Sequence, residues 1–139
     1  MSLTRLARRK SFQCMHRYAL EAWTEEQNRA EFGACFTPTG HGHNYELEAY
    51  FEGKVDSTTG MIANLTDIDA LMSEVVKPLD GKHLNFDVAA FTKRVPTTEA
   101  LAEYLASELI AAKKKRLIEV RLVKVRLYEY EDLWVDVWP

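Results

Sequence analysis

Residues 41–52 alternate between two kinds of side chain, and this alternation limits the fold more than any other feature of the sequence. Successive side chains of a β-strand point to opposite faces of a sheet, so a period of two predicts a strand with one buried face. The buried set carries two histidines and then four apolar residues: His41, His43, Tyr45, Leu47, Ala49 and Phe51. The solvent set is polar: Asn44, Glu46, Glu48 and Glu52.

Other segments show the same period of two. Near the N-terminus it places Phe12, Cys14 and His16 on one face of a strand. Residues 18–36 are irregular and partly polar, which favours a loop with room for a short helix. The further predicted strands cover residues 3–16, 117–129 and 133–138.

Two segments between the strand pairs have apolar residues at spacings of three and four, which predict amphipathic helices. The first begins with Thr66 as its cap and ends at Pro78, and the second begins with Thr97 or Thr98 as its cap. The order predicts an α+β fold, ββααββ, with a four-stranded antiparallel sheet and two helices on one face. The sheet would have two open edges, which favours a homo-oligomer.

Length and charge narrow the classes of protein. The 139 residues suit a single domain, 1–139. With 18 basic and 21 acidic residues, the net charge of −3 argues against a nucleic-acid partner. No apolar run is long enough to predict a membrane span. Two cysteines are too few for the disulfide scaffold of a small secreted protein, which favours a cytoplasmic location.

Three of the four histidines lie on the buried faces of predicted strands, where histidine is unusual. His41 and His43, two apart on one strand, project from the same face and can chelate one ion, and His16 ends another strand. Three imidazoles with no fourth protein ligand describe a catalytic zinc site with an open position. The alternative is that all three are hydrogen-bonded core histidines, and the residues by themselves leave both interpretations open.

Two other polar positions carry hypotheses of their own. Glu129 continues the predicted buried face of Val123, Val125 and Leu127, where a lone carboxylate is costly unless it is paired; the alternative is a strand end in solvent. Cys35 lies in a glycine-containing segment and is either a reactive thiol or a small buried residue, whereas Cys14 belongs to the core face of its strand.

Several motifs in order resemble the family of 6-pyruvoyltetrahydropterin and 6-carboxytetrahydropterin synthases. The segment CFTPTGHGHNY (35–45) is similar to the family signature, and FQCMHR (12–17) is similar to its first strand. DSTTGMIANLTD (56–67) resembles its hairpin-to-helix passage. Pro78-Leu79-Asp80, Thr97-Thr98-Glu99 and Tyr128-Glu129 follow in family order. The resemblance covers nearly the whole chain.

The resemblance implies a T-fold subunit, a homohexamer in which two trimers close a barrel, and active sites between subunits. It implies that Zn²⁺ is held by His16, His41 and His43 and that the substrate is 7,8-dihydroneopterin triphosphate. Cys35 would be the base that removes a proton, provided that its surroundings lower the usual thiol pKa of about 8.5. The implied substrate-binding residues are Thr97, Thr98, Glu99 and Glu129, with the glutamate at 129 anchoring the pterin.

The match breaks at one catalytic position. The family has a histidine directly after the aspartate that corresponds to Asp80, and that pair is implied to help the cysteine. Here Gly81 follows, and His83 comes two residues later. Either His83 reaches the same space through a shifted loop, or the relay is absent and His83 is an ordinary loop residue.

Two reactions on the same substrate are implied. One eliminates triphosphate and yields 6-pyruvoyltetrahydropterin, for tetrahydrobiopterin; the other yields 6-carboxytetrahydropterin, for queuosine-type compounds. The five residues between Cys35 and His41 resemble the first branch. The alternative is a zinc- and pterin-binding homologue whose lyase activity is lost or altered because Gly81 stands at the relay position.

Overall fold

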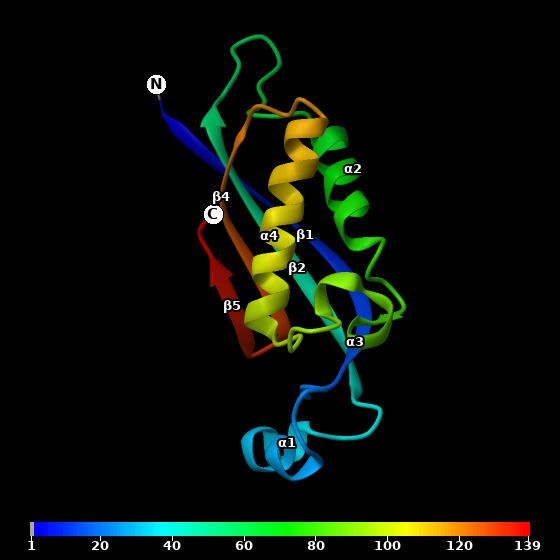
Figure 1. Ribbon diagram of the computed structural model, residues 1–139. Helices are drawn as coiled ribbons and strands as arrows, with labels where there is room; N and C mark the ends of the chain where they lie inside the picture. The colour runs from blue at the N-terminus through cyan, green and yellow to red at the C-terminus, as the bar shows by residue number, and fades with distance from the viewer. Residues whose placement is uncertain (1) are drawn as a thin grey trace.

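A five-stranded sheet forms one layer of the molecule, and helices cover one of its faces (Figure 1). The computed structural model describes residues 2–139. In the sheet the strands follow the order β3-β1-β2-β4-β5, antiparallel except for the β1–β3 pair. The strands are β1 Leu3–His16, β2 His41–Lys54, β3 Lys82–His83, β4 Arg121–Tyr130 and β5 Leu133–Val137.

The predicted α+β class and its four antiparallel strands are confirmed, although β4 begins at Arg121 and not at residue 117, because the chain turns at Leu117 with φ +57°. Strand β3 is an addition. It has two residues and runs parallel to the end of β1. A segment of that length shows no periodicity, so pattern analysis passes over it. Its effect is to bring the turn at residues 80–83 against the end of β1.

Two long helices pack on the sheet, α2 (Leu65–Val76) and α4 (Thr98–Lys115). The cap of α4 is Thr97, whose side chain accepts a hydrogen bond from the Ala100 N–H. For α2 the prediction of Thr66 as cap is wrong. Asn64 is the cap and accepts from the Thr66 N–H, since an asparagine at this position caps a helix as well as threonine does.

Short helical segments fill the connections. They are α1 (Glu25–Phe32), α3 (Leu84–Asp87) and the 3₁₀ turns η1 (Gly33–Cys35) and η2 (Ala89–Phe91). Helix α1 provides the short helix expected within residues 18–36, and it lies beyond the ends of β1 and β2, away from the sheet (Figure 1). Within residues 2–139, no helix is long and apolar enough to cross a membrane.

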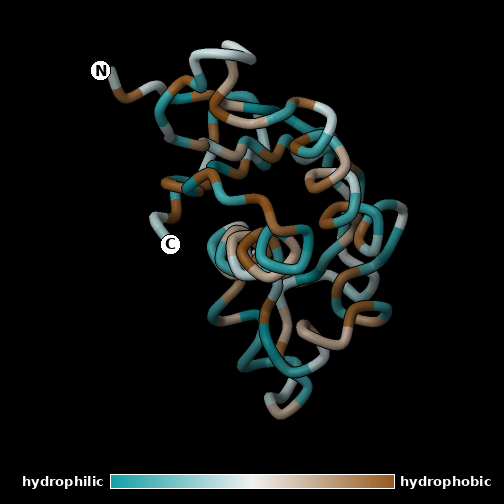
Figure 2. Tube along the Cα trace, turned by 90° about the horizontal axis from the view of Figure 1, so that it is seen from above, coloured by the Kyte–Doolittle hydropathy of each residue, from teal (hydrophilic) through white to brown (hydrophobic). Residues whose placement is uncertain are grey.

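The core lies between the sheet and the two long helices. Figure 2 views α4 end-on, beside the strands, with hydrophobic and hydrophilic residues alternating along the chain. The inward residues of β2, Tyr45 to Phe51, are all fully buried, as predicted. One position of β4 differs: a β-bulge leaves Val123 without a partner on β2, and Leu122 is buried instead.

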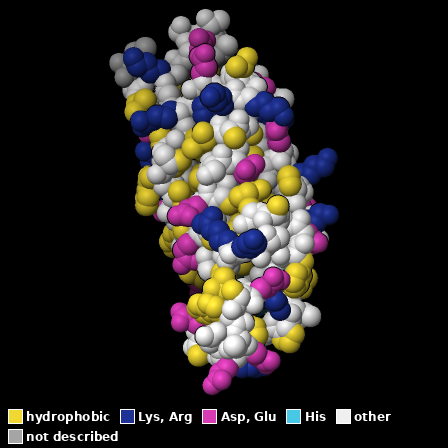
Figure 3. Space-filling view, in the orientation of Figure 1, with side chains coloured by type: hydrophobic (Ala, Val, Ile, Leu, Met, Phe, Trp, Pro, Cys, Tyr) yellow, Lys and Arg dark blue, Asp and Glu magenta, His cyan; other side chains and the backbone are white. Residues whose placement is uncertain are grey.

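The opposite face of the sheet carries ion pairs between neighbouring strands. Arg9 bonds to Glu48 at 3.0 Å, and Arg126 bonds to Asp136 at 2.7 Å. On the helix-covered side, basic and acidic side chains are interspersed (Figure 3). The surface therefore matches the near-balanced charge of the sequence.

Candidate metal and catalytic site

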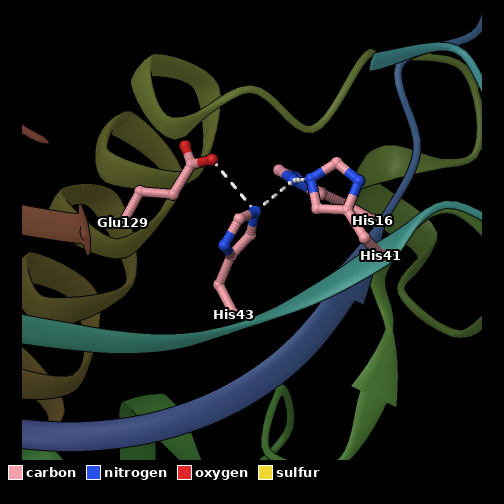
Figure 4. A group of neighbouring side chains, drawn as sticks. All are labelled: His16, His41, His43 and Glu129. Atoms are coloured by element: carbon pink, nitrogen blue, oxygen red, sulfur yellow. Dashed lines mark hydrogen bonds and ion pairs between the residues drawn. The ribbon is translucent and has the colours of Figure 1, made fainter. Parts of the chain in front are cut away.

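Three histidines from two paired strands converge where the last residue of β1 lies opposite the first residue of β2. The β1–β2 ladder runs from Leu3 opposite Lys54 to His16 opposite His41, so the last residue of β1 meets the first of β2. His43 lies two residues further on the same face. The Nε2 atom of His16 is 3.2 Å from Nε2 of His41 and 3.1 Å from Nε2 of His43 (Figure 4).

A backbone carbonyl fixes the tautomer of His16. Its Nδ1 lies 2.7 Å from the carbonyl oxygen of Pro96, which only accepts, so Nδ1 carries the hydrogen and Nε2 presents a lone pair. His16 is fully buried, and this burial lowers its pKa to about 4. Burial also lowers the pKa of His43, although the charge of Glu129 opposes the shift. Near neutral pH His16 and His43 therefore direct uncharged nitrogens toward one point, where a cation would satisfy them.

Glu129 completes the group from β4. One carboxylate oxygen lies 3.0 Å from His43 Nε2, and the other accepts a hydrogen bond from the Thr98 hydroxyl at the start of α4. It lies where the β4–β5 pairing changes register, and it is 9% exposed. One possible ligand atom from each of His16, His41, His43 and Glu129 lies within 4.8 Å of all the others. Three imidazoles and a carboxylate are a donor set that suits zinc or iron.

Tyr18 also belongs to this site, and it was not among the predicted site residues. The centroid of its ring lies 5.1 Å from that of the His16 ring and 5.9 Å from that of the Phe32 ring. Burial raises its pKa to about 12, and the charge of Glu129 adds to the effect. The sequence carries a signal for this position, because Tyr18 continues the period-two spacing of Cys14 and His16 by one step.

Cys35 lies beside Tyr18 and outside the four-residue group. It is exposed at the end of η1, and its carbonyl accepts a hydrogen bond from the Tyr18 N–H at 3.4 Å. Cys14 is buried in the core, as predicted from its strand position. Burial raises the pKa of the Cys14 thiol to about 12, with the charge of Asp80 as a second cause.

The turn that contains Asp80 is tied to the backbone of β1 by one side-chain and one backbone hydrogen bond. Asp80 accepts a hydrogen bond from the Gln13 N–H at 2.8 Å, and the Gly81 N–H donates to the Gln13 carbonyl at 2.7 Å. Gly81 has φ +75°, a conformation that side-chain-bearing residues rarely adopt. His83 follows with its Nε2 2.8 Å from the Thr39 carbonyl oxygen, so this ring contacts the loop between Cys35 and His41.

The three residues at the start of α4 have different surroundings. Thr97 caps the helix, Thr98 is buried against Glu129, and Glu99 is exposed in the first turn. Of the predicted substrate residues, the structure therefore brings Thr98 and Glu129 into direct contact and leaves Glu99 at the surface.

The family model for 6-pyruvoyl tetrahydropterin synthase matches residues 5–139. The 6-pyruvoyl tetrahydrobiopterin synthase of Homo sapiens is 39% identical over 128 residues, 91% of this chain and 86% of that protein. A protein of Archaeoglobus fulgidus named for 6-carboxy-5,6,7,8-tetrahydropterin synthase is 32% identical over 97 residues, 70% of this chain and 74% of that protein. The solved structure of Caenorhabditis elegans 6-pyruvoyl tetrahydropterin synthase superposes with a TM-score of 0.91 at 30% identity, covering 100% and 97% of the two chains.

Proposed function

The chain belongs to the 6-pyruvoyl tetrahydropterin synthase family and is a lyase of that kind, and we propose that its substrate is 7,8-dihydroneopterin triphosphate. The observation that carries the proposal is the tautomer of His16. Pro96 holds the ring hydrogen on Nδ1, so the other nitrogen is free to bind a metal beside His41 and His43. A buried core histidine with no ligand to bind would not need its second nitrogen aimed at two others.

We propose zinc as the metal, held by His16, His41 and His43. A bound zinc ion supplies Lewis-acid chemistry, which makes the C–H bond next to the substrate's side-chain hydroxyls more acidic. The hydrogen bond from His16 to Pro96 orients its ring toward the proposed metal position.

Cys35 is the proposed base that receives the proton, and its contact with Tyr18, a neighbour of His16, supports this role. Glu129 is the proposed anchor of the pterin ring, because a carboxylate can accept two parallel hydrogen bonds from a ring N–H and its neighbouring amino group. The Thr98 hydroxyl holds one of its oxygens in place. Glu99 and Asp80 are proposed to complete the substrate-binding and catalytic residues, and Thr97 is proposed to contribute by capping the helix that carries Thr98.

The product that we propose is 6-pyruvoyltetrahydropterin, within tetrahydrobiopterin synthesis. The human relative bears that activity in its name, and five residues separate Cys35 from His41. Conversion to 6-carboxytetrahydropterin, on the queuosine route, is the second candidate, which the archaeal relative's name favours. A homohexamer of two trimers and a cytoplasmic location belong to the same proposal.

A pterin- and zinc-binding protein with lost or altered lyase activity is the alternative. The observation behind it is Gly81, which offers no side chain at the position of the family's relay histidine. This alternative predicts zinc and pterin binding without turnover by the natural sequence, and activity gained by Gly81→His.

The deciding experiment incubates the zinc-loaded protein with 7,8-dihydroneopterin triphosphate and identifies the products by mass spectrometry. We expect turnover in the natural protein and a loss of at least about 100-fold in Cys35→Ala, on the scale typical of a missing general base. Cys14→Ala is the matched control and should keep its activity, since that thiol lies in the core. Turnover that survives in Cys35→Ala would contradict the assignment of the base.

A further inference from the structure

Two side chains from distant parts of the chain hold the loop over residues 36–40. The guanidinium of Arg17 donates from Nη1 to the Pro38 carbonyl at 3.0 Å, and His83 Nε2 lies 2.8 Å from the Thr39 carbonyl oxygen. Because a carbonyl oxygen only accepts, Nε2 must carry the ring hydrogen, and His83 is the donor. Two donors therefore fix two consecutive carbonyls of one loop.

Both donors are held in place before they reach the loop. The ring centroids of Phe86 and His83 are 4.3 Å apart, and the Arg17 guanidinium carbon lies 5.2 Å from the centroid of the Phe86 ring. The Asn85 side chain bonds to both backbone polar groups of Arg17, at 2.9 and 3.0 Å. The backbone N–H of His83 donates to the Asp87 carboxylate at 2.9 Å. The donors are therefore preorganised by packing and by hydrogen bonds of their own.

The loop connects two parts of the proposed site, so its position matters for both. Cys35 directly precedes it, and its last residue, Gly40, directly precedes His41. Gly40 has φ +78°, and a Cβ atom there would lie 2.0 Å from the His16 carbonyl oxygen. The end of the loop therefore packs against the backbone of a proposed metal ligand, and the two donors hold the middle of the loop.

We infer that His83 is a positioning residue that acts with Arg17 as a clamp on the loop and so sets where Cys35 lies relative to the three histidines. The inference rests on the proposed role of Cys35. His83 is a poor substitute for a proton relay in this arrangement. Its Nδ1 is buried and meets no hydrogen-bond partner within residues 2–139, so a second ring hydrogen would have no acceptor.

The test compares two substitutions of the same histidine. His83→Gln keeps an N–H donor at a similar reach but cannot carry a proton as imidazole does, whereas His83→Leu keeps the bulk and removes the donor. Amide hydrogen exchange, followed by mass spectrometry, reads the loop directly through the Phe36 and Gly40 amides. These amides donate to the Gly33 carbonyl and to the Thr37 hydroxyl.

We expect exchange of these two amides to quicken by about fivefold to tenfold in His83→Leu, the effect of one lost hydrogen bond, and to stay near the natural rate in His83→Gln. Alkylation of Cys35 by iodoacetamide should change in the leucine variant only. Lyase kcat should fall by a similar factor in the leucine variant and recover in the glutamine variant. Lys82→Ala, an exposed neighbour in the same turn, is the control for loop exchange.

Several results would overturn the clamp. Unchanged exchange and alkylation in His83→Leu would show that the loop does not depend on this donor. A glutamine variant as inactive as the leucine variant, with its loop intact, would make His83 a proton carrier. Exchange and alkylation need no turnover, so they test the clamp even if the proposed lyase reaction is wrong. Circular dichroism of each variant checks that the fold persists.

Discussion

The buried face of β2 is divided into an apolar stretch and a polar end, and the two meet different physical requirements. From Tyr45 to Phe51 the inward side chains are apolar or aromatic and fully buried under α2 and α4. At the end of the same face, His41 and His43 project inward beside Glu129. One alternation of side chains in the sequence produces both regions.

The difference lies in what each region needs from the rest of the chain. Apolar burial stabilises in proportion to the area removed from water and has no preferred direction, so many neighbours can supply it. A buried imidazole or carboxylate needs a partner at a defined atom. Those partners come from far along the sequence: Pro96 serves His16, and Thr98 serves Glu129. The apolar stretch therefore supplies stability, while the polar end requires precise placement.

The largest expected effect comes from breaking the apolar stretch. Leu47 is fully buried, and Leu47→Ala should lower the free energy of unfolding by about 2–5 kcal/mol through lost burial and a residual cavity. Urea unfolding measures this, and zinc bound per folded chain should not change. The matched variant on the same face is His41→Ala, which should weaken zinc binding and leave the metal-free stability much closer to the natural value. Equal destabilisation of the metal-free protein by both variants would abolish the distinction.

We expect acid to destabilise the fold through the polar end and not through the apolar stretch. Burial lowers the pKa of His16 to about 4, against about 6.5 in an unfolded chain, so the unfolded state binds this proton more readily. In chelator-treated protein, the stability that the neutral His16 ring contributes is therefore fully present above about pH 6.5 and is lost as the pH falls toward 4. The loss should reach about 3 kcal/mol. Urea unfolding across this range measures it, and His16→Leu should reduce the dependence between these two pH values to the part that His43 contributes. A natural protein with no slope there would contradict the buried neutral ring.

The sequence predicted the buried faces well because each depends on local periodicity. His16, His43 and Glu129 are buried as their positions in the alternation indicated. The same reasoning failed where the backbone departs from a regular ladder. The bulge near Val123 shifts the inward position to Leu122, and a bulge leaves no trace in an alternation of apolar residues.

The contacts that complete the site could not be predicted in this way. The carbonyl of Pro96 is a backbone group, which every residue possesses, so no residue type marks it as the partner of His16. The contact of His83 with Thr39 joins positions 44 residues apart through another carbonyl. Family resemblance indicated which residues gather, whereas the hydrogen that each ring carries follows only from the folded geometry.

The smallest expected effect separates two neighbouring threonines that the sequence groups together. Thr97 accepts from the Ala100 N–H, so Thr97→Ala should cost about 1 kcal/mol of stability as a lost helix cap, and Thr97→Ser should restore it. Thermal unfolding measures both variants, and pterin affinity should change little in either. Thr98 instead bonds to Glu129, so Thr98→Val should leave the cap intact and weaken pterin binding. If Thr97→Ala weakened pterin binding without loss of stability, Thr97 would act in pterin binding and not as a helix cap.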